Sequence, residues 1–504
     1  MVRFGALALI LAAGSAAGGR AQRAAPGATE TSETAETSEI APDEPSPSES
    51  GDAPGEDGPL VVELPEPRDP DAPIAPPPEV YTLDNGLRVV LQPVSGRRFT
   101  AVAMTYRVGS RDVPHGWRGL AHLTEHLMFS GTDTLNEVEI YLRLEAAGAV
   151  ERNGETGPDR TIFYEVVPSS QIPTALYLES HRLARMLAGL TEGRVARQRA
   201  VVLHEGWERG GYGWRGLLAE QLYAGTLGDD HPYRSIVERS DDVAAARLEH
   251  VQWFFQRHYA PDRATLVLVG GFDPARVRPL VERHLGPVRR SAPPVERASA
   301  PPPEPLATER RIEVEIQHDR DQLYLAWPTP ALYAPGDAEL DVISTLLTER
   351  RDAPIRRALV ESGLALEVGV RQRSHELGSV FAIHAVPSPG HDVAELRAAV
   401  DRELARLRRA PFDAATVRRA REVWARRMRL GVEDLASRAV RLGVGDDEYL
   451  PTLENERRRY LAVDASDVAR TLRRWLPTDR RLVLVGVADP RASPRGRVRS
   501  DDGG

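Results

Sequence analysis

Apolar and polar residues follow two different patterns in the first part of the folded sequence. Residues 79–91 contain two alternating apolar runs around Asn85-Gly86, which is a strong signal for a β-hairpin. The apolar run 100–108 predicts a further strand, and residues 119–132 then change to the spacing of a buried helix. We therefore predict a domain of mixed strands and helices that begins near residue 79.

The sequence also contains an internal duplication. Fourteen residues from Pro261 recur from Pro477, at a constant offset of 216, with eight identities. Each copy is an apolar strand that follows a helical segment and ends in a turn, so two copies of one structural unit are the economical explanation. The Pro-rich run 291–305 separates the copies as a linker. We predict an α+β fold with two homologous domains, 79–290 and 306–490, each a mixed, mainly antiparallel sheet packed with helices.

The ends of the chain have a different character from these domains. Residues 1–21 combine an early arginine, a short apolar run and small residues, which is typical of a secretory signal peptide. Residues 22–78 are acidic and rich in Pro, Ala and Glu, and we expect them, like the tail 491–504, to be disordered. No later apolar stretch reaches about 20 residues, so we predict no transmembrane helix and a secreted or periplasmic protein.

The amino-acid composition excludes several classes of catalytic mechanism and binding partner. The chain has no cysteine and all 65 of its basic residues are arginine, which excludes disulfides, thiol catalysis, Schiff bases and a lysine-bearing phosphate loop. It contains no G-x-S-x-G motif that would indicate a serine hydrolase. Its formal net charge of −9, to which the acidic leader contributes, argues against a nucleic-acid partner.

The residue types of a metal site lie together in the helical stretch 119–132. His122 and His126 are four positions apart, so on a helix they lie about 40° apart on one face, with Glu125 beside them. Two imidazoles suit Zn²⁺, and a neighbouring carboxylate that does not bind the metal can act as general base toward a metal-activated water. The order H-x-x-E-H is a recognised inverted zinc motif. The alternative is a packed helix that carries two histidines by chance.

A catalytic zinc site usually has three protein ligands and one open position. The best candidate for the third ligand is Glu205, in the helical stretch 195–208. Its neighbour His204 is the rival. Because the two side chains point about 100° apart on a helix, only one of them can face the metal.

The combination of H-x-x-E-H, a long gap and a glutamate in R-x-V-V-x-x-E resembles the M16 (pitrilysin-like, inverzincin) metallopeptidases. In size the chain is closest to the two-domain, processing-peptidase-like subgroup. This resemblance implies Glu205 as the third zinc ligand, a zinc site in the first domain only, and hydrolysis of peptides.

Residues 148–168 add to the resemblance, since they contain family residues at Asn153, Thr156, Asp159, Thr161 and Tyr164. Gly154 replaces the family's alanine. We expect an edge strand and return hairpin beside the zinc helix, to which a peptide could add through main-chain hydrogen bonds. Asn153 would polarise a carbonyl group or orient the backbone, and we predict Asn153, Thr156 and Phe129 as substrate-binding residues. An ordinary turn rich in Asn, Gly and Asp is the alternative.

Two family features are altered. Gln198 stands where the family usually has a second glutamate, seven positions before the third ligand; it can hydrogen-bond a ligand but holds no charge, which would reduce metal affinity or rate. In the second domain, Leu366 stands where the family has a tyrosine that contacts substrate, and no arginine falls at Ala353. The missing groups could come from an M16-like partner chain in a heterodimer. A homodimer, or a monomer that uses Arg350, Arg351 or Arg356, is the alternative.

These observations lead to one main hypothesis. The chain is a secreted zinc metalloendopeptidase that cleaves peptides or unfolded segments, with Zn²⁺ on His122, His126 and Glu205 and with Glu125 as general base. The alternative is a non-catalytic, M16-like zinc-binding or structural subunit of a peptidase complex.

Overall fold

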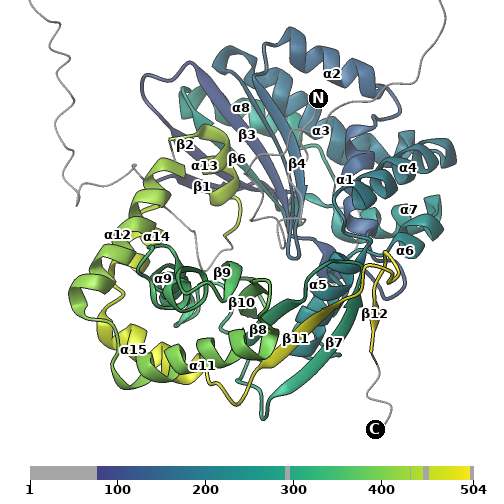
Figure 1. Ribbon diagram of the computed structural model, residues 1–504. Coiled ribbons are helices and arrows are strands. Elements are labelled where there is room, and N and C mark those ends of the chain that lie inside the picture. The colour runs from purple at the N-terminus through teal and green to yellow at the C-terminus, as the bar shows by residue number, and fades with distance from the viewer. Residues whose placement is uncertain (1–76, 290–295, 432, 446–452, 500–504) are drawn as a thin grey trace, which may run out of the picture. The chain divides into compact units, whose positions relative to one another are not determined.

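The computed structural model describes residues 77–289, 296–431, 433–445 and 453–499 (Figure 1). Within them, the strands form two six-stranded sheets, with the orders β1-β2-β6-β3-β5-β4 and β12-β7-β11-β8-β10-β9. All described residues belong to one compact unit.

The strands of the first sheet are β1 (Glu79–Thr82), β2 (Arg88–Pro93), β3 (Phe99–Tyr106), β4 (Glu151–Thr156), β5 (Thr161–Pro168) and β6 (Ala264–Gly270). The strands of the second sheet are β7 (Arg310–Ile316), β8 (Gln322–Thr329), β9 (Ala365–Arg373), β10 (Ser379–Pro387), β11 (Leu482–Ala488) and β12 (Arg497–Val498).

The helices between β3 and β7 are α1 (Leu120–Phe129), α2 (Glu137–Ala146), α3 (Ile172–Gly189), α4 (Glu192–Glu208), α5 (Trp214–Leu227), α6 (Ser240–Ala245), α7 (Leu248–His258) and α8 (Pro274–Leu285). Those of the second half are α9 (Asp337–Thr348), α10 (Pro354–Arg356), α11 (Val393–Arg409), α12 (Ala414–Gly431), α13 (Leu435–Leu442), α14 (Leu453–Leu461) and α15 (Ala465–Trp475).

The duplicated segment occupies the same place in both sheets. Strand β6 runs parallel to β2 and antiparallel to β3, and β11 runs parallel to β7 and antiparallel to β8. The other pairings within the sheets are antiparallel. The predicted α+β fold with two homologous, mainly antiparallel sheets is therefore confirmed.

The predicted hairpin at Asn85-Gly86 is also present. Strands β1 and β2 pair antiparallel with Thr82 opposite Arg88. The Asn85 side chain accepts a hydrogen bond from the Leu87 amide at 3.1 Å, which closes the turn, and Gly86 has a φ of 88°.

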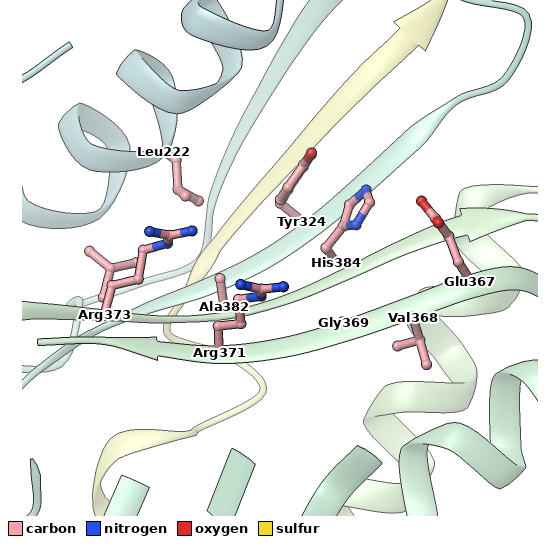
Figure 2. Close-up of a pocket in the computed structure, with 10 residues that line it drawn as sticks. Leu222, Tyr324, Glu367, Val368, Gly369, Arg371, Arg373, Ala382 and His384 are labelled. Carbon is pink, nitrogen blue, oxygen red and sulfur yellow. The ribbon is translucent and has the colours of Figure 1, made fainter. Parts of the chain in front are cut away.

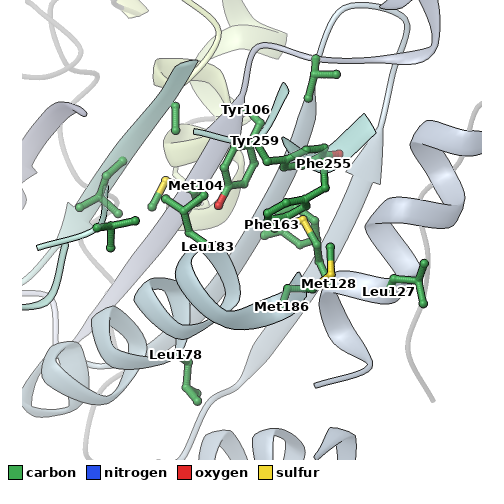
Figure 3. Packing of buried hydrophobic residues seen from close by; sticks show 14 of the residues in the cluster. Met104, Tyr106, Leu127, Met128, Phe163, Leu178, Leu183, Met186, Phe255 and Tyr259 are labelled. Atoms are coloured by element: carbon green, nitrogen blue, oxygen red, sulfur yellow. The ribbon is translucent and has the colours of Figure 1, made fainter. Parts of the chain in front are cut away.

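One face of the first sheet carries the main hydrophobic core (Figure 3). Met104 and Phe163 point from β3 and β5 toward Met128 of α1 and Met186 of α3, and all four side chains are buried. Helices α7 and α8 complete this layer. The metal-motif helix α1 is therefore fixed by a packed core on one side, which leaves its polar side for chemistry.

Each half of the chain lends a helix to the sheet of the other half. Helix α5 packs Leu218 and Leu222 on the second sheet, and α13 packs Ala439 and Leu442 on the first. The sequence did not predict this exchange, because amphipathic spacing shows that a helix buries one face but not which sheet covers it. The division of the chain at 79–290, 291–305 and 306–490 stays a prediction.

A buried polar contact also joins the halves beside the predicted substrate edge. Asp159, in the turn between β4 and β5, accepts hydrogen bonds from Arg111 and from the hydroxyl of Tyr233, both at 2.6 Å. It also accepts one from the amide of Glu376 at 3.2 Å, and the amide of Leu377 donates to the Tyr233 hydroxyl at 2.8 Å. The loop between β9 and β10 is thus attached to the β4–β5 turn.

The predicted disordered tail is wrong for residues 491–499. Strand β12 pairs antiparallel with β7, and the amide of Trp214 donates to the carbonyl of Pro494 at 2.9 Å, so this segment closes the second sheet. The predicted signal peptide (1–21), nearly all of the predicted tether (22–78) and residues 500–504 lie outside the described residues. No described helix is long and apolar enough to cross a membrane.

Candidate metal centre

Helix α1 begins at a glycine that the packing requires. Gly119 has a φ of 91°, and a Cβ at this position would lie 2.3 Å from the side chain of Val243. The chain can therefore turn sharply into the helix under α6. Leu123 and Leu127 are buried in the core, and His122 and His126 consequently share the side that faces α4.

Three side chains meet between α1 and α4. The Nε2 atoms of His122 and His126 lie 3.1 Å apart, and Glu205 Oε2 lies 3.8 Å and 3.7 Å from them. A tetrahedral zinc ion with bonds of about 2.0–2.2 Å keeps its ligand atoms roughly 3.3–3.5 Å apart. The triangle therefore has the size of a zinc site.

The donor atoms themselves support this reading. Glu205 Oε2 is buried and accepts no hydrogen bond within the described residues, although Arg209 lies 3.2 Å away as an ion-pair partner. A buried carboxylate oxygen needs a partner, and a cation held with two imidazoles would supply one. The residues present thus fit a zinc ion.

The rival ligand His204 points elsewhere. Its side chain is 74% exposed, and its Nε2 atom lies 3.1 Å from Oε1 of Glu208 on the outer face of α4. The geometry therefore favours Glu205, the residue that the family resemblance implied.

A carboxylate that the sequence analysis missed holds the first histidine. Glu238 Oε1 lies 2.9 Å from Nδ1 of His122, and the hydroxyl of Tyr212 donates to its other oxygen at 3.2 Å. Tyr212 reaches Glu238 by passing Gly206, where a Cβ would lie 2.1 Å from the tyrosine ring. A hydrogen bond at Nδ1 leaves Nε2 of His122 free to face the metal position.

The same contacts separate the pKa values of the two histidines. Burial opposes the charge on His122, but the carboxylate and hydrogen bond of Glu238 outweigh it and raise the pKa to about 9. Burial and the neighbouring charge of His122 lower the pKa of His126 to about 3. His126 is therefore a neutral imidazole across the physiological range.

Gln198 lies where the resemblance implied. Its side chain hydrogen-bonds to His126, and it lies two turns of α4 before Glu205, on the helix that supplies the third ligand. An amide orients the ring as a carboxylate would but adds no negative charge.

Glu125 lies against the edge strand β4. Thr156 donates a hydrogen bond to Oε2 of Glu125 at 2.5 Å, and a Cβ on Gly154 would lie 2.8 Å from Oε1. Burial raises the pKa of Glu125 to about 7, although His122 and Thr156 oppose the shift. A carboxylate with a pKa near 7 suits a general base at neutral pH.

The predicted substrate-binding residues separate onto two faces of the sheet. Thr156 and Phe129 lie on the zinc-helix side, where the Phe129 ring packs against Phe163 with centroids 5.3 Å apart. Asn153 pairs across the strands with Tyr164, whose ring lies on the opposite face, beneath α13. This direction favours an orienting role for Asn153 over the polarisation of a carbonyl group beside Glu125.

Replacing Glu238 by glutamine should weaken zinc binding about 10- to 100-fold, because His122 loses the charged partner that fixes its orientation. Competition with a chromophoric zinc chelator measures this change. Glu208→Gln is the matched control, since it makes the same charge change on an exposed side chain close to Glu205. Equal zinc affinities of the Glu238 variant and the control would contradict the role of Glu238.

Comparisons with known proteins identify the family of the chain. The family model described as "Insulinase (Peptidase family M16)" matches residues 88–230, and "Peptidase M16 inactive domain" matches residues 246–423. Together these matches cover more than half of the chain. The chain therefore belongs to the M16 peptidase family, as the sequence resemblance predicted.

Individual relatives are more distant. An uncharacterized zinc protease of Mycobacterium bovis is 31% identical over 220 residues, which are 44% of this chain and 49% of that protein. The match thus spans about half the length of that relative. One from Mycobacterium leprae is 26% identical over 373 residues, 73% of this chain and 82% of that protein. A protease from Helicobacter pylori has the same fold, with a TM-score of 0.73 and 22% identity over 82% of this chain and all of that one.

Proposed function

We propose that this chain is a secreted, zinc-dependent metalloendopeptidase that hydrolyses peptides or unfolded polypeptide segments. The observation that carries the proposal is the position of Glu125. Both of its carboxylate oxygens lie against the edge strand β4, and its helix α1 also carries two of the three residues of the ligand triangle. A general base, a metal position and an edge for an extended peptide thus lie together.

His122, His126 and Glu205 would hold the zinc ion. When bound, zinc supplies a Lewis acid that lowers the pKa of a coordinated water molecule to about 7. Strand β4 pairs only with β5 among the described strands, so its other edge can hold an extended peptide through main-chain hydrogen bonds. Glu125 then takes a proton on its carboxylate and returns it to the leaving amine, while Thr156 keeps that carboxylate in place.

A library of quenched fluorescent peptides tests the proposal. We expect cleavage that a zinc chelator abolishes and added zinc restores. If no peptide is cleaved by a zinc-loaded chain, whether alone or together with its proposed partner, the proposed reaction is wrong.

The alternative of a non-catalytic, zinc-binding subunit rests on two observations. Gln198 contributes no charge to the site, and Leu366, where the family has a substrate-contacting tyrosine, is 52% exposed at the start of β9. The intact Glu125, buried beside the ligands, opposes it, because a site without turnover has no need of a base.

We also propose a heterodimer in which an M16-like partner without H-x-x-E-H supplies the missing arginine and tyrosine. Within this chain, Arg350 pairs with Asp352, and both Arg351 and Arg356 lie within ion-pair distance of Glu361. Full peptidase activity of this chain as a monodisperse monomer would contradict the heterodimer, whereas activity that requires the partner would support it.

A further inference from the structure

A small pocket lies on the second sheet, on the face that α5 covers. Figure 2 shows the side chains of Tyr324, His384, Arg371 and Arg373 standing on this face, with Leu222 of α5 opposite them. The cavity encloses about 60 Å³. One water molecule needs about 10–15 Å³ of such space, so the pocket has room for a small polar group such as a carboxylate.

The register of three strands builds the pocket. Gly369 of β9 lies opposite His384 of β10, which lies opposite Tyr324 of β8. The rings of His384 and Tyr324 stack with centroids 4.5 Å apart. A Cβ built on Gly369 would have no other atom within 4 Å, so the space above this residue is empty. The missing side chain of Gly369 thus leaves the floor of the pocket open.

The polar groups of the pocket have an excess of positive charge. Glu367, Arg371 and Arg373 are alternate residues of β9 on the same face as Gly369, and Figure 2 places the arginines on one side of His384 and Glu367 on the other. Burial and the charge of Arg371 lower the pKa of His384 to about 4, so the imidazole is neutral at pH 7. The lining residues therefore sum to a formal charge of about +1.

One buried group points to an absent ligand. Tyr324 is only 3% exposed, and its hydroxyl oxygen is buried without a hydrogen-bond partner in the described part of the chain. Arg371 is exposed at the rim of the pocket, so a ligand can reach its guanidinium from solvent. Buried polar groups normally find partners, and an arginine pair is suited to the planar fork of a carboxylate.

The pocket is also attached to the candidate active site. Arg373 ends β9, and the loop that follows donates the Glu376 amide to Asp159 in the β4–β5 turn. Thr156, which holds Glu125, ends β4 immediately before that turn. One loop therefore separates the pocket strand β9 from the turn that follows β4.

We propose that this pocket binds a carboxylate group of the peptide substrate, either its C-terminal carboxylate or an aspartate or glutamate side chain. The inference rests on the proposed peptidase function, and it names the class of substrate: peptides with an anionic group at a fixed distance from the cleaved bond. Arg371 and Arg373 contact the carboxylate, and the Tyr324 hydroxyl donates to it.

The experiment measures peptide binding to the Glu125→Gln chain. This variant is used because it should leave the bound peptide uncleaved. The probe is a fluorescein-labelled, alanine-rich peptide without acidic side chains, prepared as the free acid and as the C-terminal amide. In a second pair, both peptides are C-terminal amides; one carries a single internal glutamate and the other a glutamine at the same position. We expect a carboxylate in at least one pair to tighten binding about tenfold, because a charge-assisted hydrogen bond to the arginines of the pocket is lost without it.

Two variants assign the effect to the pocket. Arg371→Gln removes a charge, and Gly369→Val fills the cavity floor without changing any charge; each should remove the preference for the carboxylate. The control Arg402→Gln lies on an exposed position of α11 and should keep it. A preference within the first pair identifies the C-terminal carboxylate as the group that binds, and a preference within the second pair identifies the glutamate side chain.

Equal binding within both pairs, including no measurable binding, overturns the inference, and so does a preference that survives both pocket variants. Failure of the wild type to cleave peptides, with its proposed partner present, counts against the proposed function, whereas absence of a carboxylate preference in the Glu125→Gln chain counts against the pocket.

Discussion

Replacing Glu125 by glutamine should lower peptide hydrolysis by about 10²- to 10⁴-fold while zinc content stays at the wild-type level. Glutamine has the same shape and still accepts the hydrogen bond from Thr156, but it cannot take a proton. Initial rates on a quenched peptide, together with metal analysis of the same preparation, measure both quantities.

The control for this substitution is Glu155→Gln. Glu155 is exposed on the same edge strand and contributes to the electrostatics of Glu125, so its substitution changes the local charge without touching the proposed base. Ordinary peptidase activity in the Glu125 variant would show that another group is the base.

Replacing Glu205 by alanine should remove zinc from the purified chain and, with it, peptide hydrolysis. Its Oε2 atom forms one corner of the ligand triangle, 3.8 Å and 3.7 Å from the two histidine nitrogens. Loss of a ligand should weaken binding by more than the roughly 10- to 100-fold that the loss of a supporting group costs. Zinc stoichiometry by elemental analysis and zinc affinity by chelator competition measure the effect.

His204→Ala is the matched control, because His204 adjoins Glu205 on α4 but lies on its exposed face. This variant should keep one zinc per chain. An unchanged zinc content in Glu205→Ala would instead indicate that His204 or another side chain is the third ligand.

Local signals in the sequence located most of the metal centre. The spacing of His122, Glu125 and His126 is sufficient to place them on one helical face, because the period of an α-helix is fixed. Spacing left the choice between His204 and Glu205 open. The family resemblance favoured Glu205, and the exposure of His204 agrees with it.

The missed groups depend on contacts between distant segments. Glu238 lies more than a hundred residues after His122, in a segment without a metal-binding pattern, and only the fold brings the two together. The pocket at Tyr324 likewise needs the register of three strands, which the sequence of any one strand does not contain.

The duplication predicted two related sheets but not the exchange of α5 and α13 between them. Repeated strands identify equivalent positions within each unit, whereas the exchange depends on how the units face each other. The order of the tail escapes prediction for a related reason. Residues 491–499 are polar and rich in arginine, and they become ordered by pairing with β7, which is already part of a sheet.

Titration of the metal-free chain with zinc shows whether peptide hydrolysis depends on the metal, with the rate recorded at each step and with any co-purifying partner chain present. We predict that the rate rises in proportion to added zinc, reaches its plateau at one zinc per chain, and stays flat in the Glu125→Gln variant although that variant binds zinc equally. Hydrolysis by the metal-free chain, or a chain that holds one zinc and hydrolyses no peptide, would contradict the account.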